Sequence, residues 1–151
     1  MTLPWIAGNE AQRAFVNLYR DTLREAGHAP EDREVFVMFP AYVGDNDEQA
    51  RSEAIEPWHR WRQFALNELG IDPSKGELYE ARLGQFSYDK KVADNRAVFG
   101  SPETCVRQLK RAQEILQPSH VGLVFHFGGM KQDRVLKSME RFARLVAPAF
   151  R

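Results

Sequence analysis

The chain has 151 residues, the size of one ordinary domain, and a complete (β/α)8 barrel of about 250 residues is therefore excluded. Hydrophobic residues make up 43% and charged residues 28% of the chain, the balance of a soluble globular protein. The 21 basic side chains equal the 21 acidic ones, which argues against a nucleic-acid binder that relies on overall charge.

No signal for a membrane or for secretion is visible in the sequence. The apolar runs are far shorter than the roughly 20 residues that span a bilayer, and residues 1–5 lack the basic start of a signal peptide. Cys105 has no partner for an internal disulfide, so a reducing cytoplasm is the expected compartment. The four histidines show no i,i+4 pair, and no metal site is predicted.

The first predicted elements are a helix and a strand. Apolar side chains at spacings of three and four predict a helix over 9–26, with Asn9 as its cap and Gly27 as its left-handed end. Residues 34–43 are apolar on both faces, which predicts a strand covered on both sides, ending or bulging at Pro40. Residues 3–7 form a possible further strand. The inward stripe of the helix is predicted to contain Ala11, Ala14, Phe15, Leu18, Tyr19, Thr22, Leu23 and Ala26.

A turn over 44–50 predicts the start of a second helix, capped by Asn46 or Asp45. This helix is expected to reach about residue 69, to kink at Pro57 and to stop at Gly70. Residues 71–98 are expected to be a long loop with one or two short helical pieces. The inward side chains of the second helix are predicted to be Ala50, Ala54, Trp58, Trp61 and Ala65.

The third helix has the clearest start, with Ser101 at the N-cap, Pro102 at the first helical position and Glu103 in the first turn. A second buried strand is predicted over 121–127, followed by a tight turn at 128–130 and a last helix over about 131–147. The alternation predicts an α/β domain over 1–151, with two or three parallel strands and four main helices.

Three stretches of the C-terminal third form a recognisable set: 98–104 with its Gly-Ser-Pro-Glu start, the strand ending in Phe-Gly-Gly-Met at 127–130, and 135–150. Together they resemble the end of the luciferase-like, flavin-dependent monooxygenases. Residues 19–27 and 42–51 are similar to that family too. Its members are complete TIM barrels roughly twice this length, so the resemblance implies a partial, half-barrel arrangement that matches their C-terminal half.

The resemblance implies an enzyme, or a subunit of one, that oxidises a small organic substrate with reduced flavin and O2. FMN is the expected cofactor, and a deazaflavin is the second choice. Missing strands leave unpaired edges and apolar surface, so we expect a homo-oligomer or a complementing chain that supplies the N-terminal half. The alternative is a non-catalytic half barrel that serves assembly or binds a small ligand.

Candidate catalytic and cofactor-binding residues follow the last predicted strand. His126 lies at the end where barrel active sites are built, and it can donate to a flavin ring or act as a base. The alternative is a histidine hydrogen-bonded in the wall of the barrel mouth. Phe127, Gly128 and Gly129 are expected to approach the cofactor, although the two glycines also suit a turn that needs positive φ.

Three aromatic residues, Tyr42, Phe86 and Tyr88, are the predicted substrate contacts; Phe86 and Tyr88 are equally consistent with local anchoring of the long loop. Trp58 and Trp61, which flank His59 and Arg60 in an aromatic-basic cluster, fit a helix core better than a nucleic-acid site.

Cys105 lies in the first turn of a predicted helix, where a thiol pKa can be lowered. It is nevertheless expected to be a small buried apolar residue rather than a reactive thiol.

Overall fold

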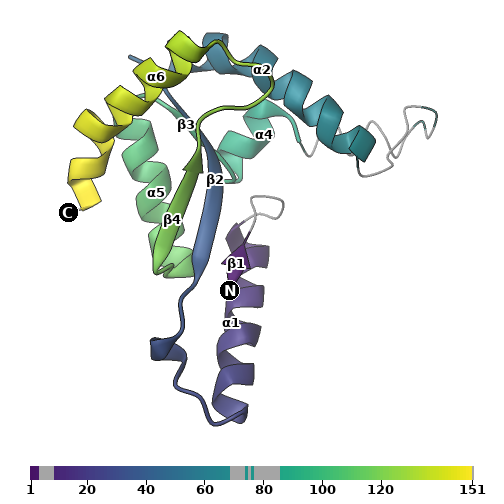
Figure 1. The fold of residues 1–151 in the computed structure, drawn as a ribbon, viewed down its shortest axis with the longest axis vertical. Coiled ribbons are helices and arrows are strands. Elements are labelled where there is room, and N and C mark those ends of the chain that lie inside the picture. Colours follow the sequence, from purple (N-terminus) through teal and green to yellow (C-terminus); the bar gives the residue numbers. More distant parts are fainter. Residues whose placement is uncertain (4–8, 69–73, 75, 77–85, 151) are drawn as a thin grey trace.

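A computed structural model describes residues 1–3, 9–68, 74, 76 and 86–150. These residues form a small parallel sheet with helices packed against it (Figure 1). The elements in chain order are β1 (Thr2–Leu3), α1 (Asn9–Glu25), a 3-10 turn (Pro30–Asp32), β2 (Phe36–Val43), α2 (Asp47–Glu68), α4 (Tyr88–Ala93), β3 (Val98–Gly100), α5 (Pro102–Leu116), β4 (His120–Val124), α6 (Gln132–Arg141), a π-helical turn (Phe142–Val146) and a 3-10 turn (Ala147–Phe150).

Strand β2 is the centre of the sheet, because every ladder between the described strands includes it. Its residues 36–40 pair with β4, while 36–37 pair with β1 and 41–43 pair with β3, all in parallel. The backbone N–H groups of Phe36 and Gly44 donate to Met1 and Gly100. Backbone groups of a strand alternate between its two edges, so β1 and β3 follow one another along one edge and β4 occupies the other.

The expectation that Pro40 ends or bulges the strand was wrong, since β2 continues to Val43. Pro40 is an even number of positions from Phe36 and Gly44, so its nitrogen faces the edge that β1 and β3 share. Along that edge it lies between the residues paired with β1 and those paired with β3. The proline therefore removes no hydrogen bond from the ladder with β4, which explains its place in a central strand.

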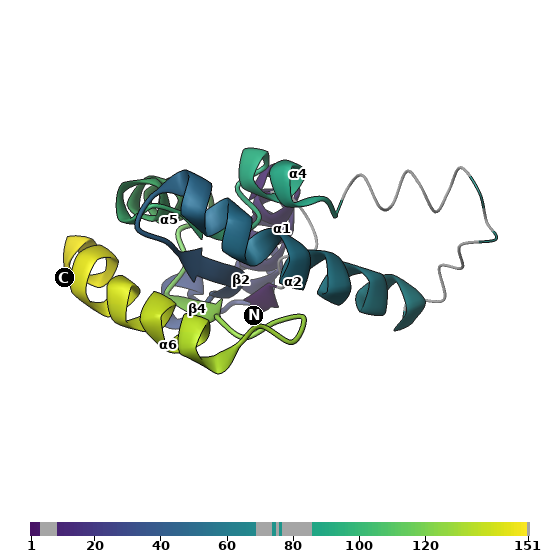
Figure 2. The same ribbon diagram turned by 90° about the horizontal axis from the view of Figure 1, so that it is seen from above.

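The chain forms three strand–helix units: β1 with α1, β2 with α5, and β4 with α6. Helices α2 and α4 and strand β3 are inserted between β2 and α5, and they lie over the carboxyl ends of the strands (Figures 1 and 2). The odd-numbered side chains of β2 enter a core closed by the helices. This core contains Leu3, Val16, Val35, Val37, Phe39, Ala41, Val43, Val98, Cys105, Leu109, Ala112, Leu116 and Val146.

The other face of the sheet lacks such a cover among the described residues. Phe36 and Met38 of β2 are half-buried, as are Gly122 and Val124 on the same face of β4. A Cβ on Gly122 would lie 2.5 Å from the Phe36 ring, so the glycine makes room for that ring. The open face is the one that points into the interior of a TIM barrel.

Two burial predictions were wrong in ways that follow from this open architecture. In α1 the buried side includes Gln12 and Val16, whereas Phe15 is 53% and Leu18 65% exposed. Strand β4 was expected to be buried, but Val121 is 41% exposed. In both cases, apolar side chains that were expected to be buried have no neighbouring element packed against them in the described part of the chain.

The predicted helix boundaries were largely confirmed. Gly27 has a φ of 77° after α1, Asn46 accepts from the backbone N–H of Gln49 at the start of α2 (2.8 Å), and Ser101 caps α5. One short helical piece, α4, lies in the predicted loop, but β3 at its end was missed. Among the described residues, no helix is both long and apolar enough to cross a membrane.

Candidate active site

The carboxyl ends of β2, β3 and β4 lie at one edge of the sheet because the strands are parallel. Helix α2, helix α4 and the start of α6 cover this edge (Figures 1 and 2). A mainly aromatic cluster fills the space between them, made of Tyr42, Ala50, Ala54, Trp58, Tyr88, Ala97, Phe99, Phe127, Met130 and Val135. In α/β barrels this is the edge that carries the active site.

His126 lies two residues beyond β4, in the segment that leads to α6. Its side chain is exposed, and it forms no hydrogen bond or ion pair with the described residues. The structure therefore does not show the alternative, in which the histidine would be hydrogen-bonded to other residues at the barrel mouth. Both ring nitrogens remain available to a ligand, as a donor and an acceptor in the neutral ring.

Phe127 points away from solvent rather than toward an open site. Its side chain is 4% exposed, and its ring centroid lies 5.8 Å from that of Trp58 and 5.5 Å from that of Phe99. The ring thus belongs to the aromatic cluster. The Phe127 side chain is therefore not open to a ligand.

Gly128 and Gly129 both have positive φ, at 55° and 68°, so the turn itself requires glycine. At Gly128 the close approach is to α2, because an added Cβ would lie 1.7 Å from the carbonyl oxygen of Pro57. The Gly128 carbonyl also accepts from Arg60 Nε at 2.8 Å. At Gly129 an added Cβ would meet nothing within 4 Å. Of the pair, Gly129 is the one whose backbone is open to a ligand.

Tyr42 is fully buried at the end of β2, and its hydroxyl donates to the carboxylate of Glu53 on α2. Burial, and then the Glu53 carboxylate, raise the pKa of Tyr42 above its usual value. The phenol therefore stays protonated. Sequence reasoning missed Glu53, although its place one turn beyond Ala50 on the predicted helix was a usable signal.

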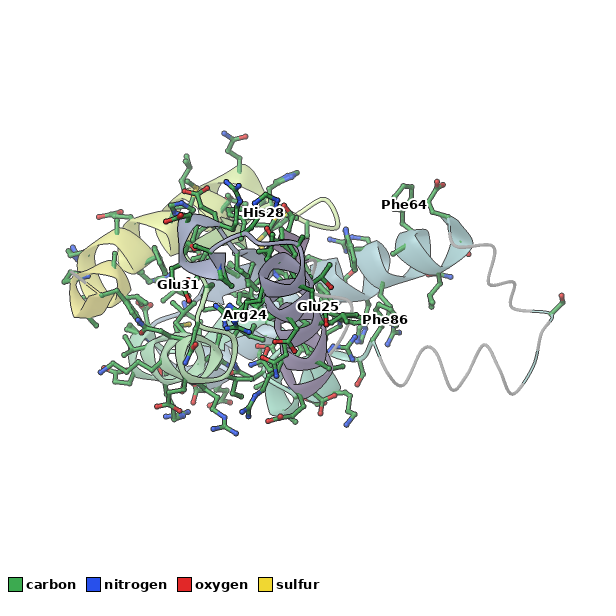
Figure 3. The ribbon with its side chains drawn as sticks, turned by 90° about the horizontal axis from the view of Figure 1, so that it is seen from below. Arg24, Glu25, His28, Glu31, Phe64 and Phe86 are labelled. Carbon is green, nitrogen blue, oxygen red and sulfur yellow. The ribbon has the colours of Figure 1, made fainter. Side chains whose placement is uncertain are left out.

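Phe86 and Tyr88 anchor the chain where it returns to the sheet. The Tyr88 ring stacks on Phe99 with centroids 5.1 Å apart, and the Phe86 carbonyl accepts from Trp58 Nε1 at 2.7 Å. Figure 3 shows Phe86 beside the middle of α2, whereas Phe64 lies closer to the C-terminal end of that helix. Tyr88 is thus part of the aromatic cluster, and Phe86 is bonded to it through its carbonyl, an arrangement that fits the anchoring alternative.

Lys91 of α4 is a buried cation that the sequence did not single out. It is fully buried, with Nζ 4.6 Å from the ring centroid of Phe86 and 5.8 Å from that of Trp58. Burial, and then the charge of Arg96, lower the pKa of Lys91 to about 7. No local pattern distinguishes it from Lys90, because only the fold decides which of the two adjacent lysines points inward.

The Gly-Ser-Pro-Glu stretch has a structural role in this chain. Asp47, at the start of α2, accepts from the backbone N–H of Ser101 at 2.6 Å and from the hydroxyl of Thr104 at 3.0 Å. These bonds, the one from the Ser101 N–H first, lower the pKa of Asp47, although desolvation of the carboxylate opposes the shift. Gly100 leaves room for the carboxylate, since an added Cβ would lie 2.6 Å from it. The motif joins the N-termini of α2 and α5.

Two other predictions from the sequence were confirmed. Trp58 is fully buried and stacks on Trp61 with centroids 5.0 Å apart, so these indoles form helix core. Cys105 is fully buried, and burial raises the pKa of its thiol to about 12. Such a thiol is protonated at neutral pH and inert.

The parallel strands, their covering helices and the shared carboxyl edge correspond to part of a TIM barrel. A family model described as luciferase-like monooxygenase matches residues 1–117, and the chain belongs to this family. The match ends before the Phe-Gly-Gly-Met turn at 127–130, so the family model does not include that turn.

Among curated relatives, the chain is 26% identical over 161 residues to the alkanal monooxygenase alpha chain of Aliivibrio fischeri, covering 98% of this chain and 45% of that protein. It is 28% identical over 131 residues to the 4-hydroxyprotoasukamycin monooxygenase of Streptomyces nodosus subsp. asukaensis, covering 86% and 34%. The chain thus spans less than half the length of these relatives.

Solved structures show the same fold. The monooxygenase RslO1 from Streptomyces bottropensis matches 99% of this chain with 41% of its own, at a TM-score of 0.72 and 20% identity. The oxygenating constituent of 3,6-diketocamphane monooxygenase from Pseudomonas putida, solved with FMN, matches 94% of this chain with 40% of its own, at 0.60 and 24%. The coenzyme F420-dependent tetrahydromethanopterin reductase of Methanopyrus kandleri matches 95% with 43%, at 0.60 and 17%.

Proposed function

We propose that this chain is part of a luciferase-like flavin-dependent monooxygenase. It forms the side of the active site where the substrate and the flavin ring meet. The family match over residues 1–117 carries the proposal. It is supported by the solved relative that contains FMN and by the exposed His126 and Gly129 beyond β4. FMN is the favoured cofactor, and the F420-dependent relative makes a deazaflavin the second choice.

The residues at this edge fit one side of a flavin rather than a complete flavin site. The backbone of Gly129 is open, and the imidazole of His126 is exposed and unbonded within the described residues. When bound, reduced flavin would supply the electrons for the reaction with O2. His126 would hold or donate a proton at an imidazole nitrogen, and Gly129 would let the ring approach the backbone.

The partner we favour is a chain, or chain segment, that supplies the remaining barrel strands. Three described strands, β1, β2 and β4, begin strand–helix units, so two copies would provide six of the eight strands of a TIM barrel. A homo-oligomer alone would leave the barrel incomplete. A complementing N-terminal chain that supplies the other five strands would complete it.

The exposed apolar side chains of α1 support this partner. Glu10 and Arg20 reach toward α5, where they meet Arg111 at 3.8 Å and Gln117 at 3.1 Å. At 100° per residue, Phe15 and Leu18 lie on the opposite flank of the helix. That flank is where the preceding helix of a barrel would pack.

The other end of the partial barrel is also apolar. Val121 on β4 is 41% exposed, and Leu136 and Met139 on α6 are 55% and 46% exposed. Strand β4 pairs with β2 alone among the described strands, so its outer edge is available to a further strand. The apolar side chains at both ends are thus where missing neighbours would bind.

A titration of the purified chain with FMN, oxidised and then reduced, tests the cofactor. Saturable binding in the micromolar range, weakened in Gly129→Ala, would support the proposal. Absence of binding in every association state of the chain would mean that the flavin site needs a complementing chain or that this chain has left flavin chemistry, and a repeat of the titration with the complementing chain distinguishes the two.

Catalysis is tested separately in the assembled protein. His126→Ala is expected to slow substrate oxidation by about 10²-fold or more, the usual contribution of a general acid or base. An unchanged turnover number would remove His126 from the mechanism. Leu18→Asp, compared with the neighbouring Asn17→Asp, tests the partner, because only the former should weaken association.

A further inference from the structure

Glu53 of α2 is a carboxylate held in one orientation at the carboxyl edge of the sheet. The buried hydroxyl of Tyr42 donates to one of its oxygens. The other oxygen has no hydrogen bond within the described residues, and it is accessible to solvent because the side chain is only half-buried. A carboxylate oxygen accepts hydrogen bonds and does not donate them. Glu53 therefore presents a free acceptor whose direction is fixed by a buried residue.

This acceptor lies beside the turn that carries the candidate cofactor residues. Glu53, Pro57 and Arg60 follow one another at spacings of four and three, so they share one face of α2. That face contacts Gly128, where an added Cβ would lie 1.7 Å from the Pro57 carbonyl oxygen and where the carbonyl accepts from Arg60 Nε at 2.8 Å. Glu53 is one turn earlier on the same face, between the turn over 126–130 and the end of β2.

Arg134, in the first turn of α6, is an uncommitted cation at the same edge. Arg134, Ser138 and Arg141 lie on one face of α6, again at spacings of four and three. This face packs on the end of β2, because the Ser138 hydroxyl accepts from the backbone N–H of Val43 at 2.7 Å and Arg141 binds Asp45 at 2.7 Å. The Arg134 guanidinium is half-buried and accessible, and it has no hydrogen bond or ion pair within the described residues.

Arg134 acts on the Tyr42–Glu53 pair without being bonded to it. Burial first, and then Glu53, raise the pKa of Tyr42, and the charge of Arg134 opposes these effects. Neither Arg134 nor Glu53 has an ion pair in the described part of the chain. A free acceptor and free N–H donors are thus held at one edge by two different helices. Such a pair matches a ligand edge on which an N–H group lies beside a carbonyl group.

We propose that Glu53 and Arg134 bind the pyrimidine edge of the flavin ring, where the N3–H group lies between two carbonyl groups. The free oxygen of Glu53 accepts from N3–H, and Arg134 donates to a neighbouring carbonyl oxygen. Tyr42 is a positioning residue, because it orients the carboxylate while it is itself fully buried. This inference rests on the flavin site proposed above, and it adds the ring edge that this chain recognises.

The test compares FMN with 3-methyl-FMN, which lacks the N3–H group, in fluorescence titrations of the chain, alone and with the complementing chain. FMN should bind about tenfold or more tightly than the methylated analogue, the usual effect of a hydrogen bond to a charged group. Glu53→Gln should reduce this preference to about threefold or less, since its amide oxygen can still accept from Tyr42 but its NH2 group then faces N3–H. Glu56→Gln removes the same charge three residues later and should keep the preference.

Two further variants separate the roles of the other residues. Tyr42→Phe should lower the preference for FMN while the affinity for 3-methyl-FMN stays the same, a change that a purely structural role would not produce. Arg134→Gln should weaken the binding of both flavins by about threefold or more, because both keep their carbonyl groups. Lys137→Gln, on the exposed side of α6, should change either affinity by less than about twofold.

Equal affinity of the parent chain for FMN and 3-methyl-FMN would overturn this proposal and leave the flavin site itself standing. A preference that is unchanged in Glu53→Gln would do the same, as would equal weakening by Arg134→Gln and Lys137→Gln. A parallel loss of both affinities in Tyr42→Phe would refute the positioning role. Absence of FMN binding, both alone and with the complementing chain, would overturn this proposal together with the proposed function.

Discussion

The contrast between Gly128 and Gly129 gives the sharpest prediction about stability. Both have positive φ, so alanine at either position costs about 1–2 kcal/mol in backbone strain. Only at Gly128 would the new methyl group lie 1.7 Å from the Pro57 carbonyl oxygen and 2.6 Å from its carbon. Both atoms are backbone, so α2 or the turn must shift, which adds about 1–3 kcal/mol.

Gly128→Ala should therefore lower the free energy of unfolding by about 2–5 kcal/mol, and Gly129→Ala by about 1–2 kcal/mol. Urea unfolding followed by circular dichroism measures the difference, with the slope of the transition as a check that both variants unfold in the same way. Equal midpoints would refute the close packing of the turn on the Pro57 backbone of α2. The Arg60 bond to Gly128 adds little, because that side chain is half exposed.

Three other groups give measurable effects. Burial lowers the Lys91 pKa to about 7, so above this pH the unfolded chain binds more protons than the folded one, and stability should rise toward pH ~10 by at most about 1.4 kcal/mol per unit. Lys91→Met should abolish that rise in urea titrations at several pH values. Ser138→Ala leaves the buried N–H of Val43 without its 2.7 Å partner and should cost about 1–3 kcal/mol, whereas Lys137→Ala on the exposed side should cost under about 0.5 kcal/mol. Asp47 contributes stability above its ordinary pKa of 3.8 that is lost as pH falls through its lowered folded pKa; Asp47→Asn should flatten this acid dependence. An unchanged acid profile would contradict the assigned bonds to Ser101 and Thr104.

Local signals in the sequence predicted the helices well. The caps at Asn46 and Ser101 and the left-handed Gly27 depend on a few adjacent residues, and all three were found as expected. Strand β3 was missed because three residues are too few for a periodic pattern. Its pairing with β2 is decided by the tertiary fold.

Burial was predicted less well, because it depends on neighbours that the sequence does not display. Phe15, Leu18 and Val121 have the apolar character of core residues, yet each lies on an open flank. The candidate site shows the same limit. Chain position correctly brought His126 and Gly129 to the carboxyl edge, but only packing shows that Tyr42 and Phe127 point into the aromatic cluster.

The central position of β2 also constrains the order of folding. Val35, just before β2, donates its backbone N–H to the hydroxyl of Ser119, just before β4, and these two residues are 84 positions apart in the chain. Long loops must close before such contacts form, and this slows folding. During synthesis, β2 therefore leaves the ribosome well before its β4 partner exists. Until residues 120–124 emerge, one edge of the strand stays open to other chains, and this is the stage at which a chaperone or a rapidly bound partner segment would protect it most.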